Sequence, residues 1–198
     1  VAAQQSAVKA TSLAYKPPVI SGLTGAGTSY ASTAGGDIVY VIGSQLGPLS
    51  TSVSDIVVTY GSSASELTAV TCHVISASTK LQCLTAPGTG AGHSWRVSVG
   101  AQESAVFAGD TAYAPPTVSS FDGVGASLAL TSGYQTVVIN GLNFGPSLSD
   151  VDRVYYSEPN NTRFEVTQNC SMTAAHSVLT CTTAPGAGAR LSWIVVVD

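Results

Sequence analysis

Charged side chains are scarce in this sequence, at only 9% of 198 residues against roughly 25% in ordinary soluble domains. Only seven residues are basic, and the formal net charge is −4. A nucleic-acid-binding surface needs clustered Lys and Arg, so we expect no nucleic-acid partner. No stretch approaches about 18 uninterrupted apolar residues, and we therefore expect no membrane-spanning helix.

The sequence is rich in hydroxyl-bearing and turn-forming residues instead of charged ones. The sequence contains 27 Ser, 21 Thr, 20 Gly and 9 Pro, but a single Met. Thr, like the abundant Val, favours β-strands, and Gly and Pro favour the tight turns between them. The composition therefore predicts an all-β protein built from short strands.

The sequence repeats itself at a constant spacing of 98 residues. A single offset at every match indicates a tandem duplication with no net insertion at any of these matches. The repeated features are a Pro-Pro pair, a Gly-Pro turn, a Thr-Ala-Pro-Gly run and a Ser-Trp pair: Pro17-Pro18 and Pro115-Pro116, Gly47-Pro48 and Gly145-Pro146, Thr85–Gly88 and Thr183–Gly186, and Ser94-Trp95 and Ser192-Trp193.

Each copy contains short apolar stretches punctuated by Gly and Pro. About seven short strands in under 100 residues is typical of an immunoglobulin-like β-sandwich, with the repeated tryptophan filling the space between the sheets. We expect an N-terminal strand and linker at 1–16, with the strand at about 1–14, then a complete domain at 17–114 and a second domain at 115–198. The expected strands are Val19–Leu23, Asp37–Ile42, Asp55–Tyr60, Leu67–Ile75, Lys80–Leu84, Ser94–Val99 and Ser104–Phe107 in the first copy, and Thr117–Phe121, Tyr134–Asn140, Asp152–Ser157, Phe164–Met172, Val178–Thr182 and Ser192–Val197 in the second.

Several of the repeated motifs together resemble the IPT/TIG family of immunoglobulin-like domains. They are the opening Pro-Pro-x-[VI], the turns Gly43–Pro48 and Gly141–Pro146, the Cys…Leu-x-Cys-x-Thr-x-Pro segment and a closing strand rich in Val. The resemblance covers nearly all of both copies. It implies a fold and not an activity, because such domains occur in receptors, DNA-binding factors, carbohydrate enzymes and surface proteins.

Four cysteines form two pairs, and the members of each pair are 11 residues apart. Four cysteines allow three disulfide connectivities, and the duplication favours Cys72–Cys83 and Cys170–Cys181. Free buried thiols are the alternative. A zinc site would need His partners, and the three histidines do not recur in register. Disulfides would indicate an oxidising, extracellular location.

Two Asn-x-Ser/Thr sequences are consistent with a secreted glycoprotein. They place candidate N-glycans on Asn160 and on Asn169, which precedes Cys170. The many Ser and Thr residues would also suit O-glycosylation, so glycans are possible partners.

The N-terminal segment matches the last strand of the first copy and the linker that follows it. Over positions 1–18, eleven residues are identical to those 98 positions later. The second copy ends at Asp198, the counterpart of Gly100, so we expect it to lack its last strand and to expose a groove of unpaired backbone groups. The candidate donor-strand residues are Ala3, Gln4, Ser6, Ala7, Val8 and Ala10, with Val8 expected to face the core and Lys9 to face outward.

An extended peptide can fill such a groove by strand addition. The repeated linker, Tyr15–Pro18 and Tyr113–Pro116, favours a groove in another copy of the chain, and repeated head-to-tail contacts that do not close generate a fibre. The sequence therefore predicts a structural subunit of an extracellular helical fibre that resembles donor-strand-complemented pili in mechanism.

Two other interpretations stay open at this point. The chain could be a window cut from a longer tandem array in which the next repeat continues covalently, as in a surface or adhesion ectodomain. An enzyme is the other class, but no catalytic triad, Cys/His pair or phosphate-binding loop occurs, so we expect no catalytic residue, no metal and no cofactor. Sugar binding by Tyr155 and Tyr156 is a further possibility, set against an ordinary half-buried strand.

Overall fold

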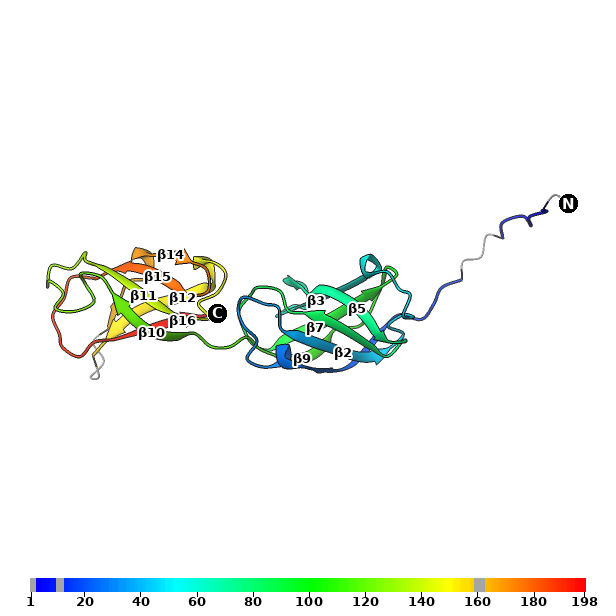
Figure 1. Cartoon of the computed structure of the whole chain (residues 1–198), viewed down its shortest axis with the longest axis horizontal. Coiled ribbons are helices and arrows are strands. Elements are labelled where there is room, and N and C mark those ends of the chain that lie inside the picture. The colour runs from blue at the N-terminus through cyan, green and yellow to red at the C-terminus, as the bar shows by residue number, and fades with distance from the viewer. Residues whose placement is uncertain (1–2, 10–12, 159–162) are drawn as a thin grey trace.

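The structure is a computed structural model that describes residues 3–9, 13–158 and 163–198. Two β-sandwiches lie end to end, and the N-terminal segment leads away from the first of them (Figure 1). The C-terminus lies beside the junction between the sandwiches (Figure 1). In the described residues, no helix is both long and apolar enough to cross a membrane.

The first sandwich consists of two antiparallel sheets. Its first sheet has the order β1-β2-β6-β5, and its second has the order β4-β3-β7-β8, with β9 also paired to β7. The strands are β1 (Val19–Thr24), β2 (Ile38–Ser44), β3 (Ile56–Gly61), β4 (Leu67–Thr68), β5 (Val70–Ser76), β6 (Lys80–Leu84), β7 (His93–Val99), β8 (Gln102–Glu103) and β9 (Phe107–Thr111).

The second sandwich repeats this arrangement without counterparts of β8 and β9 among the described residues. Its sheets have the orders β10-β11-β15-β14 and β13-β12-β16. The strands are β10 (Thr117–Asp122), β11 (Thr136–Leu142), β12 (Val151–Ser157), β13 (Arg163–Glu165), β14 (Cys170–Ala174), β15 (Val178–Thr182) and β16 (Ser192–Val197).

Alternating side chains from the facing sheets build a separate core in each sandwich. In β2, Val39 and Val41 are fully buried while Tyr40 between them is only partly buried, as expected for a strand with one face inward. Trp95 is fully buried at the centre of the first core, as the sequence predicts. Burying a side chain such as Val39 contributes about 1.5–3 kcal/mol, so these inward stripes drive the packing of sheet on sheet.

Both expected disulfides are formed, and no cysteine is free. Cys72–Cys83 joins β5 to β6, and Cys170–Cys181 joins β14 to β15. Each disulfide thus ties an outer strand to its sheet. Such disulfides form and persist in oxidising environments, so they indicate an extracellular protein.

The strand boundaries differ from the sequence-based expectation mainly at three places. The segment expected as Leu67–Ile75 divides into β4 and β5, which lie in different sheets because the chain crosses between sheets at Ala69. The corresponding segment of the second copy divides in the same way into β13 and β14. The expected last strand, Ser104–Phe107, is wrong, because the strand is β9 and starts only at Phe107.

Candidate functional site

The edge of β16 is the main difference between the two sandwiches. In the first sandwich, β7 pairs with β3 on one side and with β8 and β9 on the other. In the part of the chain that the structure describes, its counterpart β16 pairs with β12 alone. An unpaired strand edge presents free N–H and C=O groups and is a template for another strand.

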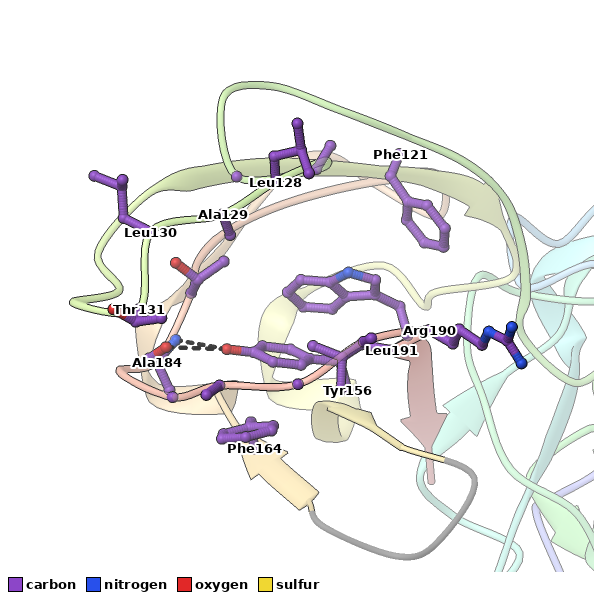
Figure 2. A pocket seen from close by; sticks show the side chains of 18 residues that line it. Phe121, Leu128, Ala129, Leu130, Thr131, Tyr156, Phe164, Ala184, Arg190 and Leu191 are labelled. Carbon is purple, nitrogen blue, oxygen red and sulfur yellow. Dashed lines mark hydrogen bonds between the residues drawn. The ribbon is translucent and has the colours of Figure 1, made fainter.

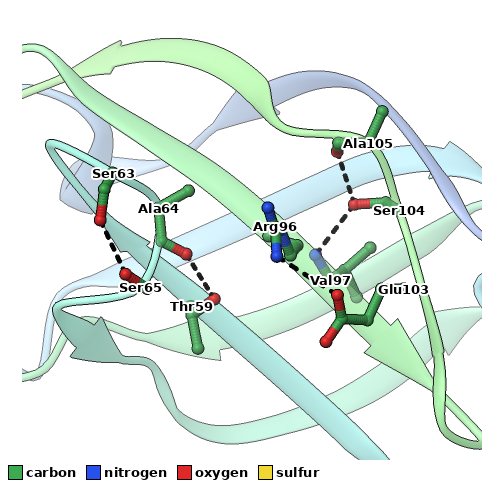
Figure 3. A network of polar contacts seen from close by, with 9 residues as sticks. All are labelled: Thr59, Ser63, Ala64, Ser65, Arg96, Val97, Glu103, Ser104 and Ala105. Carbon is green, nitrogen blue, oxygen red and sulfur yellow. Dashed lines mark hydrogen bonds and ion pairs between the residues drawn. The ribbon is translucent and has the colours of Figure 1, made fainter.

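The first sandwich shows what closes this edge. Ser104 follows β8 and is buried, and its hydroxyl accepts a hydrogen bond from the Val97 N–H at 3.1 Å (Figure 3). The Ser104 N–H in turn donates to the Val97 carbonyl at 2.8 Å. An ion pair of 3.2 Å between Arg96 and Glu103 lies beside these bonds on the exposed face (Figure 3).

Two aromatic side chains anchor the end of β9 in the first core. Tyr113 is only 7% exposed, its hydroxyl lies 2.7 Å from that of Tyr60, and it donates to the Ala86 carbonyl at 2.7 Å. Trp95 stacks on Tyr60 and donates its indole N–H to the Thr111 hydroxyl at 2.8 Å. Burial raises the pKa of Tyr60 and of Tyr113 above 10, so both phenols stay protonated at neutral pH.

The position that corresponds to the Tyr113 side chain is an open pocket of about 670 Å³ in the second sandwich (Figure 2). Tyr156 forms its floor, donating to the Ala184 carbonyl at 3.2 Å and accepting from the Ala184 N–H at 2.9 Å. It is the structural counterpart of Tyr60, because each of the two tyrosines pairs with the repeated tryptophan of the neighbouring strand, although the local offset is 96 residues. Phe121 and Trp193 line the pocket with their ring centroids 6.3 Å apart, and Phe121 is 43% exposed. Burial raises the pKa of Tyr156 as well, so this floor is an uncharged aromatic surface.

The predicted donor residues lie away from both sandwiches. Ala3, Gln4, Ser6, Ala7 and Val8 are exposed in an extended segment, and the exposed fraction of Val8 is 93% (Figure 1). Ala10 lies outside the described residues. The structure therefore brings none of the described donor residues to β16 of the same chain.

The counterparts of the donor residues in the first sandwich favour a different orientation from the one expected for Val8 and Lys9. Val106, the counterpart of Val8, is 49% exposed, whereas Phe107, the counterpart of Lys9, is half-buried against the core. The reason is a one-residue shift in register along β7. Glu103 pairs with Ser98 whereas Phe107 pairs with Trp95, so one extra residue lies between β8 and β9 and changes which residues face inward after it. The orientation of Val8 and Lys9 in a joint stays a prediction, and the register of β9 favours Lys9 as the inward residue.

Sequence comparison alone missed the importance of one position. Tyr15 is one of the eleven N-terminal identities, matching Tyr113, but nothing in the sequence marks Tyr113 as the residue that fills the core end of β9. In this chain Tyr15 is 88% exposed. The sequence shows that Tyr15 and Tyr113 match, and the structure shows that Tyr113 is buried and hydrogen-bonded in the first core.

The two candidate glycosylation sites differ in what the structure describes. Asn169 is exposed at the end of the 3₁₀ turn η4 (Thr167–Asn169), directly before the disulfide-bonded Cys170. Asn160 lies outside the described residues. Glycosylation at both positions stays a prediction.

The candidate sugar-binding face is only partly available. Tyr156 is buried as the floor of the pocket, and Tyr155 is covered by the Arg163 guanidinium at 4.0 Å from its ring. The pair is therefore better explained as one inward and one outward residue of β12.

Two facing antiparallel sheets with a buried tryptophan define an immunoglobulin-like β-sandwich. Residues 18–114 match the IPT/TIG domain family, and this part of the chain is an IPT/TIG domain. IPT/TIG is a non-catalytic type of domain.

Among solved structures, the chain is similar to SGBP-B from a complex xyloglucan utilization locus in Bacteroides uniformis, with 15% sequence identity and a TM-score of 0.36. The match covers 92% of this chain and 46% of the other, so the chain spans about half the length of that protein. No curated protein sequence matches the chain.

Proposed function

We propose that the chain is a structural subunit of an extracellular fibre, in which N-terminal residues 1 to about 15 of one copy add a strand to β16 of a neighbouring copy. One observation carries the proposal. The pocket beside β16 is the place that Tyr113 fills in the first sandwich, and the exposed Tyr15 stands in a copy of the same segment. Strand addition of this kind satisfies backbone groups along the edge and fills side-chain pockets beside it.

The first sandwich supplies the register for the added strand. There, Ser98 pairs with Glu103 and Val99 with Gln102. At the offset of 98, Val196 would pair with Gln5 and Val197 with Gln4, and the Ser6 hydroxyl would accept from the Val195 N–H. The added strand would run from the junction to the far end of the second sandwich, where Tyr15 would enter the pocket.

Changes in polar partners at this joint support the pairing. Arg96 and Glu103 form an ion pair in the first sandwich, and their counterparts are Ile194 and Gln5. Both charges are absent together, so neither of these two positions leaves an unpaired charge in the joint. An exposed ion pair contributes only about 0–1 kcal/mol, so its loss costs the joint little.

Two inward positions differ from the first sandwich. Lys9 stands in place of Phe107, beside Trp193, where its aliphatic stem can cover the ring while its ammonium reaches water. Leu13 stands in place of Thr111, so the Trp193 indole N–H would bond to water instead of a hydroxyl. We therefore expect the joint to be somewhat weaker than the covalent closure of the first sandwich.

The geometry favours a second copy over the chain's own groove. Tyr15 is two residues before Pro17, and extended chain spans at most about 3.6 Å per residue. The first sandwich begins at the end that faces away from the second, whereas the pocket lies at the far end of the second sandwich (Figure 1). Tyr15 therefore cannot reach the pocket of its own chain, and repeated insertion into the next copy gives an open fibre.

Paired cysteines test the proposed register directly. The variant Q5C/V196C places two thiols at positions predicted to be direct cross-strand partners, where Cα atoms are about 4.5–5.5 Å apart and a disulfide can form. We expect a ladder of covalent multimers on a non-reducing denaturing gel. The control Q5C/R153C moves one thiol from β16 to Arg153 of β12, which pairs with Val196 on the side of β16 opposite the free edge. The two thiols are then separated by β16, and this variant should give monomers.

Two results would contradict the proposal. Q5C/V196C could stay monomeric under conditions in which the native protein assembles. Alternatively, the native material could have a polypeptide mass well above 19.9 kDa under denaturing, reducing conditions, with covalently continuous residues pairing with β16, as in a longer tandem array. Removal of residues 1–14 should abolish assembly, and an added peptide of residues 1–16 should then bind one per chain.

A further inference from the structure

The junction between the two sandwiches of one chain has a specific set of contacts. Thr33 is 1% exposed, and its hydroxyl lies 3.1 Å from Nδ1 of His176. Its N–H donates to the Asn143 side-chain oxygen at 3.5 Å. A β-carbon on Gly145 would lie 2.9 Å from the methyl group of Thr89, so the two ends are in close contact. The junction is therefore a polar contact centred on Thr33.

The counterparts of the second-sandwich residues at this junction gather at the opposite end of the chain. Gln45, Gly47, Ser78 and Gly100 stand 98 positions before Asn143, Gly145, His176 and Asp198. These four line one shallow pocket of about 190 Å³ together with Tyr15 and Lys16. We call the surface formed by Gln45, Gly47, Ser78 and Gly100 the receiving surface.

The receiving surface has the same backbone structure as the end of the second sandwich. The φ angles of Gln45 and Asn143 are 60° and 61°, and those of Ser78 and His176 are 60° and 64°. The Ser78 N–H donates to the Gly47 carbonyl at 2.7 Å, as the His176 N–H does to Gly145 at 2.8 Å. Residues that rarely adopt positive φ hold this shape twice, so the two surfaces match in form.

The complementary partner is exposed at the far end of the second sandwich. Thr131, the counterpart of Thr33, is exposed, although its carbonyl accepts from the Gly186 N–H at 2.9 Å as that of Thr33 does from Gly88. Ala187, the counterpart of Thr89, is exposed as well. We call Thr131, Ala187 and Gly188 the distal surface.

The junction residues are covered by the neighbouring sandwich, whereas the receiving surface and the distal surface are mainly exposed to solvent. Thr33 is buried and Thr131 is exposed, although both sit in the same local backbone. Asn143 and His176 are partly buried at the junction, whereas Gln45 and Ser78 are exposed. Each free surface is therefore the uncovered half of a contact that the chain already makes once within itself.

We propose that the receiving surface of one copy binds the distal surface of another copy, as a second interface beside the inserted strand. Thr131 takes the place of Thr33, with its hydroxyl facing Ser78 and its N–H facing the side-chain oxygen of Gln45. This inference rests on the proposed fibre, because strand insertion through the repeated Pro-Pro linker brings the two surfaces together. The contact fixes how each subunit is set on the next, and so the twist of the fibre.

The contact between copies is not a replica of the junction. Gln45 is one methylene longer than Asn143, and the Ser78 side chain is much shorter than that of His176. Ser78 therefore leaves room that a bridging water can fill, and no histidine is present. The joint between copies should differ in angle from the joint within a chain, so a fibre would alternate two angles with a repeat of two sandwiches.

Paired cysteines again provide the test, in the full chain. The variant T33C/H176C calibrates the junction within one chain, and T131C/S78C places thiols at the corresponding positions of two copies. With a short bis-maleimide that bridges about 8 Å, T131C/S78C fibres should give a ladder of multimers in a yield comparable to the intrachain product of T33C/H176C. The control T131C/A108C uses Ala108, which is exposed on β9 far from the receiving surface, and should give no ladder.

The outcomes separate this inference from the proposed fibre. If Q5C/V196C gives its ladder and T131C/S78C does not, the strand insertion stands and the second interface is wrong. If neither pair gives a ladder, the proposed fibre itself fails. A charge placed at the contact by T131E should leave folding unchanged but reduce assembly at least tenfold, and S78K in the same chain should restore part of it by pairing across copies; assembly unaffected by T131E would overturn the inference.

Discussion

Replacing Tyr15 by alanine is the most informative perturbation of the proposed joint. Tyr113 is 7% exposed in the first sandwich, and Tyr15 is 88% exposed in the free N-terminal segment. Insertion would thus bury most of an aromatic side chain, about 160 Å², which contributes about 4 kcal/mol at 25 cal/mol per Å². Hydrogen bonds of the phenol to its partners add about 1 kcal/mol each.

The variant Y15A should therefore weaken each joint by about 3–5 kcal/mol, in the range seen when a buried aromatic is cut to alanine. Because 1.4 kcal/mol is a factor of ten, the soluble concentration in equilibrium with fibres should rise by a factor between roughly 10² and roughly 4 × 10³. Sedimentation of assembled material at a series of total concentrations measures this value. Unfolding of the subunit should be unchanged, since Tyr15 is exposed in the free chain.

The variant V8A is the matched control within the same segment. Its counterpart Val106 is 49% exposed, so we expect a loss below about 1 kcal/mol and less than about a fivefold change in soluble concentration. Equal effects of Y15A and V8A, or fibres of Y15A as stable as those of the native chain, would refute the proposed register and the role of the pocket.

Three further predictions concern the joint and the two cores. The variant K9F restores the residue found at Phe107 and should lower the soluble concentration several-fold in the sedimentation assay; a rise would place Lys9 outside the joint. Burial lowers the pKa of His93, so its contribution to stability is present above about pH 6.5 and is lost as the pH falls through the lowered pKa; H93L should reduce that loss in thermal unfolding scans between pH 7.5 and 4.5, and an unchanged pH dependence would contradict it. The variant C170A/C181A opens a short loop and should lower the unfolding free energy by about 3 kcal/mol in denaturant titrations, whereas no change would show that the disulfide does not stabilise the second sandwich.

Much of the fold follows from the repeat. The constant offset of 98 residues, the alternating apolar strands and the two cysteine pairs predict two sandwiches with one disulfide each, and the structure has both disulfides. The buried position of Trp95 was predictable because a large aromatic in a strand of a small sandwich has no other place to pack.

The details of the site were not predictable from the sequence. Ser104 to Val106 read as strand because their side chains alternate, but they lie between β8 and β9, and β9 starts at Phe107. One extra residue between Glu103 and Phe107 shifts the register along β7 and reverses which residues face inward from Phe107 onward, and periodicity alone does not reveal it. The receiving surface was also hidden, because Gln45 and Ser78 are ordinary exposed polar residues and acquire meaning only when their counterparts are seen in contact with Thr33.

A density map of native fibres, obtained by electron cryomicroscopy, tests the central claim most directly. The account predicts an extra strand antiparallel to β16, with an aromatic side chain over Tyr156, that continues through Pro17 and Pro18 into the first sandwich of the next copy. A strand at this edge that continues from Asp198 of the same chain, or an edge of β16 left unpaired in the fibre, would contradict it.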